Sequence, residues 1–168
     1  MAWLEAPDRR LIALTLLVKL GVLAVGAIAY TVLSHGMISG PHDALAIWNR
    51  WDAPHYLDLA VFGYRADDPG NLPMFSKLGD LPLFIVFYPL FPWLVGAVNA
   101  LLGDPVSSAF VVTTVASLFV APLLYRLVRH DEEPGVAMRA AVFALVFPTA
   151  YFLHLPYTEP LLIGAKLT

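Results

Sequence analysis

The sequence lacks cysteine, and charged residues make up only 14% of its 168 positions. Without cysteine, neither a disulfide framework nor a cysteine-based metal site can form within these residues. No glycine-rich phosphate loop, Asp-x-Asp pair, His-Glu-x-x-His motif or nucleophile-elbow serine occurs either. The net charge of −3 comes without any basic run, which argues against a nucleic-acid partner. The common signatures of soluble metalloenzymes and nucleotide-binding proteins are therefore missing.

Apolar residues fill the space that charged residues leave. They account for 59% of the chain, and the mean hydropathy is +0.71. A soluble domain needs more polar surface than this, so the composition predicts an integral membrane protein whose partner is the lipid bilayer. Because a bilayer favours helices, which satisfy their own backbone hydrogen bonds, we expect an all-α, polytopic fold.

The apolar tracts predict a single membrane domain with several spans. The predicted spans cover residues 11–33, 107–128 and 136–153. A further span is predicted to begin at residues 157–168, where about 1.5 Å per residue gives only about 18 Å of helix, too short to cross. We therefore expect the chain to be the N-terminal fragment of a longer multi-span protein.

Residues 81–102 are also apolar, but Pro82, Pro89 and Pro92 interrupt them. Proline removes a backbone donor and clashes with the preceding turn, so a straight span is not expected here. Basic residues near tract ends favour the cytoplasmic side, and they cluster at positions 9–10 and 126–139. An even number of crossings must separate these clusters, so residues 81–102 are predicted to be an interfacial or re-entrant segment. Residues 35–105 then form one large extracytoplasmic loop.

Within that loop we predict short helices over residues 43–50 and 52–62 and an irregular stretch over residues 67–80. The same topology predicts that residues 154–159 reach the outer face. Lys19 lies inside the first span. It is interpreted mainly as snorkelling back to the near interface, with contact to a lipid-linked phosphate as the alternative.

Asp52 is the central candidate for chemistry, between Trp51 and Ala53-Pro54. One interpretation is an ordinary N-cap of the following helix. The other is a general base whose basicity depends on its surroundings. Trp51 is either an interface anchor or a platform for a sugar ring.

His55 and Tyr56 lie one turn beyond Asp52, where they either hydrogen-bond a sugar or phosphate or pack at the interface. Asp58 is predicted to point off this face into solvent or towards another helix. Glu159 is an ionisable group in an apolar stretch, which by default faces a cavity and is functional. Capping of the last helix by Thr158 or Glu159 is the alternative.

Four segments together resemble the PIG-V-like mannosyltransferase family, which contains the second GPI mannosyltransferase and its prokaryotic relatives. These are Arg50-Trp-Asp-Ala-Pro-His-Tyr56 with Gly63-Tyr64, then Phe87-Tyr-Pro-Leu-Phe-Pro92, Phe147-Pro-Thr-Ala-Tyr-Phe-Leu153 and Pro156-Tyr-Thr-Glu159. The segments occur in the family's order. The resemblance covers nearly all of this chain but only the N-terminal part of a typical member.

The resemblance implies a GT-C glycosyltransferase fold whose first large extracytoplasmic loop carries the catalytic aspartate, here Asp52. It implies transfer of mannose, with inversion, from a polyprenyl- or dolichyl-phosphate-mannose donor to a glycan or glycolipid acceptor. Arg50 and His55 would steady the lipid phosphate, and Tyr157 and Glu159 would line the pocket. No cofactor is called for by the residues, and the resemblance adds only a divalent metal as an alternative.

The expected location is the bacterial plasma membrane, or the endoplasmic reticulum membrane if the protein is eukaryotic. Two rival functions stay open at this point. One is a GT-C transferase for another lipid-linked sugar, and the other is a non-enzymatic transporter or scaffold. A transporter would place its ionisable residues near mid-membrane on broken helices.

Overall fold

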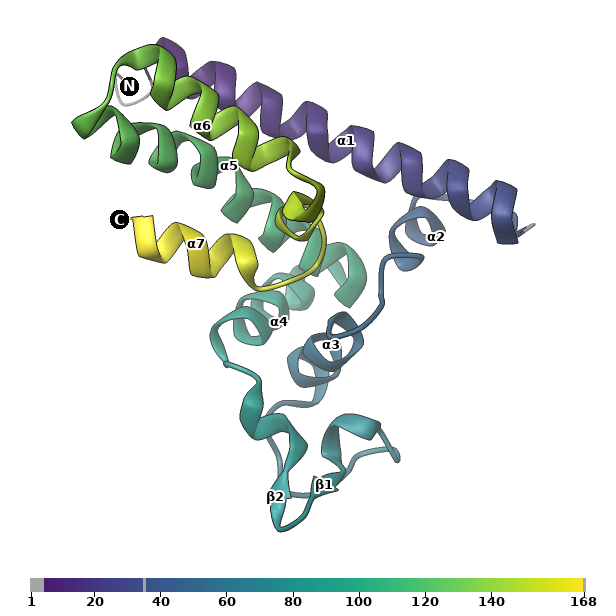
Figure 1. Ribbon diagram of the computed structural model, residues 1–168. Coiled ribbons are helices and arrows are strands. Elements are labelled where there is room, and N and C mark those ends of the chain that lie inside the picture. The colour runs from purple at the N-terminus through teal and green to yellow at the C-terminus, as the bar shows by residue number, and fades with distance from the viewer. Residues whose placement is uncertain (1–4, 35, 168) are drawn as a thin grey trace.

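The computed structural model describes residues 5–34 and 36–167 and has an all-α architecture (Figure 1). Residues 35 and 168, at the ends of the predicted loop and last segment, lie outside the described residues. The α-helices are α1 (Ala6–Ser34), α2 (Pro41–Ala46), α3 (Ala53–Phe62), α4 (Leu90–Leu102), α5 (Pro105–Asp131), α6 (Pro134–Val146) and α7 (Glu159–Leu167). Short elements complete the chain: the 3-10 helices η1 (Pro73–Phe75), η2 (Leu83–Val86) and η3 (Pro148–Leu153), and the strands β1 (Lys77–Leu78) and β2 (Leu81–Pro82).

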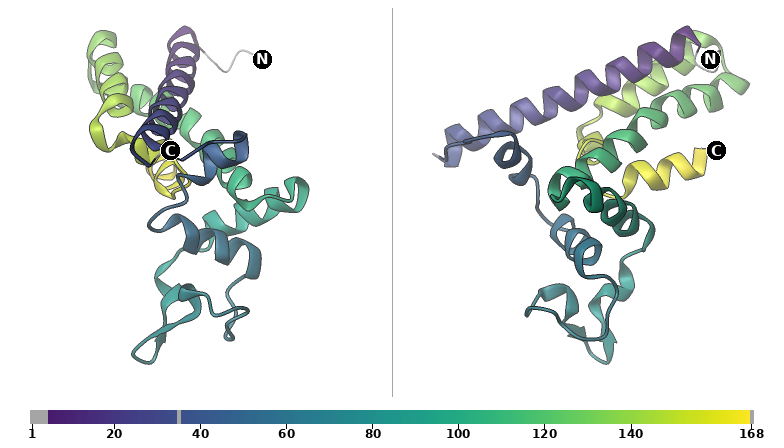
Figure 2. Two further views of the ribbon diagram at one scale, coloured as in Figure 1. Left: turned by 90° about the vertical axis from the view of Figure 1, so that its right-hand side faces the viewer. Right: turned by 180° about the vertical axis from the view of Figure 1, so that it is seen from behind.

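Within the described residues, two helices are long and apolar enough to cross a membrane, namely α1 and α5. They contain the residues of the predicted spans 11–33 and 107–128. Helices α5 and α6 pack beside the first half of α1, and α7 lies along α5 (Figures 1 and 2). Small residues mediate the contact among α1, α5 and α6, because Ala121, Ala137 and Ala141 are fully buried there. Such residues let helix backbones approach closely in a membrane.

The start of α1 and the end of α5 lie at the same end of the molecule. The Arg126 guanidinium donates to the Asp8 carboxylate at 2.6 Å, and the Asp8 side chain is 2% exposed. Asp8 also accepts a hydrogen bond from the Glu5 backbone N–H at 3.0 Å. The two basic clusters therefore lie close together at one end of the molecule.

Helix α6 is shorter than the predicted span over residues 136–153. The α-helix stops at Val146 and continues as the 3-10 helix η3. Pro148 explains the change, because a proline pushes the residue before it out of the α region, and Phe147 is extended at φ −59° and ψ 143°. Residues 81–102 are likewise divided, into β2, η2 and the 13-residue α4, which at about 1.5 Å per residue is about 20 Å long.

The loop helices partly follow the prediction. Helix α3 covers residues 53–62 as expected, whereas α2 begins at Pro41 and ends at Ala46 instead of covering residues 43–50. Asp43 does not start the helix; it accepts hydrogen bonds from the backbone and hydroxyl of Ser39. The stretch over residues 67–80 contains η1 and the first strand of a two-stranded antiparallel ribbon, which pairs Lys77 with Pro82.

The main apolar core holds the loop against the long helices. It joins buried residues of α3, α4 and α5 with the turn that follows η3: Ala53, Tyr56, Leu57, Phe91, Val95, Val106, Ala109, Phe110, Val112, Leu155 and Tyr157. The segment around Asp52 is thus fixed to the same core as the segment before α7.

Candidate functional site

Asp52 occupies the N-cap position of α3, but its side chain makes no capping hydrogen bond. Its backbone carbonyl accepts from the Tyr56 N–H at 3.1 Å, while its side chain is exposed. Trp51 before it has φ 51°, a left-handed conformation that is rare for a bulky residue. Such strain costs about 1–3 kcal/mol and clusters at functional sites. The carboxylate is therefore left available by a turn that is costly to form.

The turn before α7 is bound directly to this segment. The Tyr157 hydroxyl donates to the Arg50 carbonyl at 3.1 Å, across 107 residues of sequence. Tyr56 and Thr158 share a side-chain hydrogen bond. Asp52 lies close enough to Tyr56, Tyr157 and Glu159 for its charge to act on all three. The two polar segments singled out in the sequence thus meet in one place.

Aromatic rings form one wall of this site. The Trp51 ring lies 6.4 Å from both the Tyr151 and the Phe152 ring, measured between centroids. Tyr151 and Phe152 stack at 4.1 Å, and Phe152 meets Tyr157 edge-on at 5.1 Å. Tyr151, Phe152 and Thr158 were not among the predicted site residues, although all three lie within the segments that carry the family resemblance.

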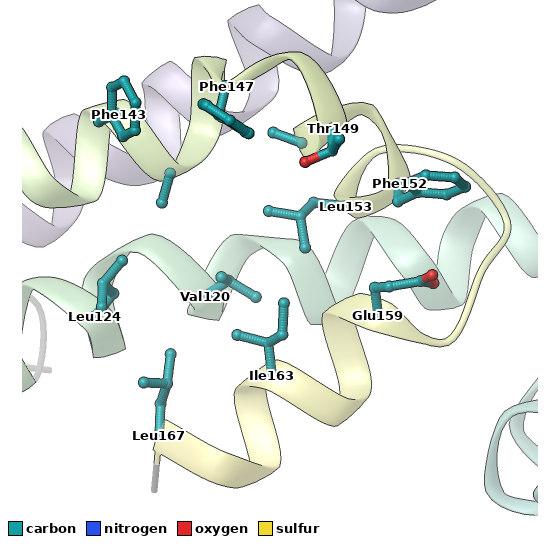
Figure 3. Close-up of a pocket in the computed structure, with 12 residues that line it drawn as sticks. Val120, Leu124, Phe143, Phe147, Thr149, Phe152, Leu153, Glu159, Ile163 and Leu167 are labelled. Atoms are coloured by element: carbon teal, nitrogen blue, oxygen red, sulfur yellow. The ribbon is translucent and has the colours of Figure 1, made fainter.

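Two apolar cavities border this aromatic wall. One, of about 530 Å³, lies between α5, α6 and α7. Figure 3 shows Glu159 at one end of it, with its carboxylate directed away from Ile163 and Leu167. The other, of about 670 Å³, lies along α1 and is lined at its polar end by Arg50, Trp51 and Tyr157. The Glu159 Oε2 atom is buried and has no hydrogen-bond partner in the described chain.

His55 is half-buried and lies apart from the turn before α7. Its ring meets Phe87 edge-on at 5.5 Å, and its charge acts on Asp58. The buried His55 Nδ1 atom has no hydrogen-bond partner among the described residues. Asp58 is half-buried, so it does not point fully into solvent, which was one of its two predicted positions. Burial raises its pKa above the usual value.

Burial also raises the pKa of Tyr56, and the negative charges of Asp52 and Glu159 raise it further. The side-chain hydrogen bond between Tyr56 and Thr158 lowers this pKa, but by less than burial raises it. Tyr56 is 8% exposed, and its ring packs edge-on against Phe87 and Phe91 at 4.9 and 5.2 Å. The phenol therefore stays neutral at physiological pH. It can donate or accept a hydrogen bond without carrying charge.

Lys19 does not snorkel to the near interface. It lies halfway along α1, is 4% exposed, and donates from Nζ to the His154 carbonyl at 2.8 Å. The interpretation of a snorkelling lysine is therefore wrong. The reason is that η3 and the turn after it lie beside the middle of α1 (Figure 1) and supply an acceptor there.

The adjacent acids Asp67 and Asp68 stabilise their own loop. Asp67 forms a two-bond ion pair with Arg65 at 2.6 and 2.9 Å, and Asp68 accepts from the N–H groups of Gly70 and Leu72, each at 2.9 Å. Among the described residues, no three His, Cys, Asp or Glu side chains gather as metal ligands.

Comparison with known proteins adds a distant similarity. Over 130 residues, 74% of this chain, the sequence is 31% identical to GPI mannosyltransferase 2 of Cryptococcus neoformans var. neoformans serotype D, in both strain JEC21 and strain B-3501A. The matched region is 27% of each fungal protein, so the chain spans about a quarter of these relatives. No family model matches the chain. No solved structure matches it either.

Proposed function

We propose that this protein is a membrane-embedded mannosyltransferase of the GT-C type, with residues 50–56 and 157–159 forming part of its active site. The donor is a polyprenyl- or dolichyl-phosphate mannose, and the acceptor is a hydroxyl of a glycan or glycolipid on the extracytoplasmic side. The distant similarity to a GPI mannosyltransferase supports the sugar, and two membrane-length helices support the location.

One observation carries the proposal. The Asp52 carboxylate is exposed and free of capping, in a segment that Tyr157 ties to the turn carrying Glu159. A base used for helix capping would be a poor proton acceptor, because the hydrogen bond stabilises its charged form. Asp52 has no such bond and stands beside the aromatic surface formed by Trp51 and Phe152. Aromatic rings next to a carboxylate suit the apolar face and the hydroxyls of a sugar.

The proposed step is an in-line displacement. Asp52 accepts the proton of the acceptor hydroxyl, the acceptor oxygen bonds to C1 of mannose, and the bond from C1 to the phosphate oxygen breaks. The lipid phosphate leaves with the electron pair, and the configuration at C1 inverts. Arg50, at the polar end of the cavity along α1, offsets the negative charge that grows on the phosphate. Tyr157 and Glu159 line the sugar site. His55 lies in the first turn of α3, after Asp52.

The test is transfer of radiolabelled mannose by full-length protein in membranes. Asp52→Asn keeps the shape and removes the base, so transfer should fall about 10²- to 10⁴-fold. Asp80→Asn, a charge loss at an exposed loop position, is the matched control and should transfer normally. Equal transfer by wild type and Asp52→Asn would remove the base role, and no transfer by wild type across several donors would reject the enzyme.

A transporter is the second candidate function, and one observation favours it. Buried Lys19 lies halfway along α1, beside the point where α6 gives way to a 3-10 segment and a turn. Broken helices beside ionisable residues at mid-membrane are typical of transporter sites. Uptake of a labelled sugar phosphate into proteoliposomes, without sugar transfer, would support this function over the transferase.

A further inference from the structure

Lys19 has an unusual set of neighbours for a buried lysine. It ends a stripe of buried residues on α1, after Asp8, Leu11 and Thr15, which faces α5 and α6. In the described part of the chain no carboxylate lies within ion-pair distance of its ammonium group. Its hydrogen bond goes instead to the backbone carbonyl of His154, at 2.8 Å.

This hydrogen bond holds the turn before α7, which carries Tyr157 and Glu159 of the proposed site. Within the turn, the backbone bonds are short-range: His154 N–H to Tyr151 at 2.9 Å and Tyr157 N–H to Leu155 at 2.7 Å. The His154 ring adds little, because Nε2 lies 3.5 Å from the Leu145 carbonyl and Nδ1 has no described partner. Lys19 thus fixes one side of the turn, and the Tyr157 hydroxyl fixes the other side to Arg50.

Stability does not explain a lysine here. Burying an ammonium group is costly, and a single carbonyl returns only part of the lost hydration. An apolar side chain of similar length at such a site is often neutral or stabilising. Because Lys19 costs stability and contacts a turn of the proposed site, we infer a functional role for it.

We propose that Lys19 is a positioning residue for sugar transfer. By holding the His154 carbonyl, it sets the position of Tyr157 and Glu159 relative to Asp52 without touching substrate itself. This inference rests on the proposed function for its kinetic part. Its structural part, the dependence of the turn on Lys19, stands independently.

The test compares Lys19→Met, which removes the donor at similar length, with Lys19→Arg, which keeps it. The matched control is Lys166→Met, the same change at an exposed position of α7. In full-length protein, Lys19→Met should lower kcat by on the order of 10- to 10²-fold with a smaller change in KM. Lys19→Arg should recover part of the loss, and Lys166→Met should behave as wild type. If Lys19→Met does not accumulate, Lys19→Leu, which also removes the donor, replaces it with the same expectation.

A second readout does not need activity. The Trp51 and Phe152 rings are 6.4 Å apart, so Trp51→Cys with Phe152→Cys, as the sole thiols of the protein, should cross-link with a short bismaleimide. Adding Lys19→Met should lower the yield, and adding Lys166→Met should not. Unchanged kcat and unchanged cross-linking in Lys19→Met would overturn the proposal. If the double-cysteine protein cross-links but the wild type transfers no mannose, the proposed function is rejected, and the structural dependence is judged by cross-linking alone.

Discussion

Two aspartates in similar local sequences are used differently by the fold. Asp104 and Asp52 each precede a helix with proline in its first turn. Asp104 is extended, at φ −136° and ψ 109°, and its carboxylate accepts from the Ser107 N–H at 3.0 Å. Asp52 is already helical, at φ −79° and ψ −19°, so its side chain is not directed at those N–H groups. The difference in backbone φ and ψ thus separates a capping carboxylate from an available one.

At the residue scale, Asp58 predicts a specific pH dependence. Burial raises its pKa in the folded protein above the ordinary 3.8, so the folded state holds the proton more tightly than the unfolded state. The stability associated with this group is therefore full below pH 3.8 and declines as pH rises towards the folded pKa. Asp58→Asn removes this penalty, so it should raise Tm by more at pH 7 than at pH 4.

The measurement is thermal unfolding in detergent at both pH values, with Asp80→Asn as the exposed control. The difference between variant and wild type isolates Asp58 from the other carboxylates that titrate in the same range. A larger Tm gain at pH 4 than at pH 7 would contradict the predicted direction.

At the element scale, α1 contacts the loop closely where Gly26 faces Trp48. A side-chain carbon on Gly26 would overlap the Trp48 indole ring, which lies two residues before Arg50. Gly26→Ala should therefore displace Trp48 and cost about 1–3 kcal/mol through overpacking. Because Trp48 and Arg50 line the same cavity along α1, mannose transfer should fall as well.

Gly21 supplies the matched control on the same helix. No atom lies within 4 Å of the space that its side chain would occupy. Alanine is a better helix former than glycine by about 1 kcal/mol, so Gly21→Ala should be neutral or stabilising. Because Gly21 lines the same cavity, the two variants are compared by stability. Similar losses in both variants would mean that the helix, and not the Trp48 contact, is sensitive.

The elements differ in how far the sequence could predict them. The apolar tracts of α1 and α5 and the Asp52 start of α3 were readable because length, hydropathy and proline are local signals. The early end of α6 also has a local signal, Pro148, although the predicted span ran past it to residue 153. The two-residue strands were not readable, because a small ribbon leaves the apolar pattern almost unchanged. The contact of Lys19 with His154 spans 135 residues, so no local pattern contains it.

The same contrast applies to the candidate site. The polar residues around Asp52 and before Glu159 were found because they stand out in an apolar chain. The topology argument placed both segments on one face, but the sequence did not contain their hydrogen bonds. The Tyr157 bond to Arg50 and the Tyr56 bond to Thr158 depend on how α3, α5 and η3 pack. The roles of these residues in chemistry remain predictions.

At the scale of the whole molecule, the Asp8–Arg126 ion pair fixes the start of α1 and the end of α5 together. We therefore predict that Glu5 and His130, both exposed, face the same side of the membrane. Single cysteines introduced at these positions, with any other cysteine of the full-length protein replaced, should react with an impermeant maleimide in the same vesicle orientation. Asp80→Cys in the loop should react only in the opposite orientation.

Labelling of Asp80→Cys and His130→Cys from one side would contradict this arrangement. It would mean that the loop lies on the same side of the membrane as the start of α1 and the end of α5. The proposal of an extracytoplasmic site would then be rejected. A denatured sample in which all three cysteines react controls for local accessibility.

The burial of Lys19 also has a consequence in time. Its acceptor lies 135 residues further along the chain, and synthesis proceeds at about 5–20 residues per second. For roughly 7 to 27 seconds, therefore, the nascent α1 holds an ammonium group whose final partner has not been made. An unpaired ammonium group inside a membrane is costly, so we expect the middle of α1 to stay next to water or polar groups until η3 is made.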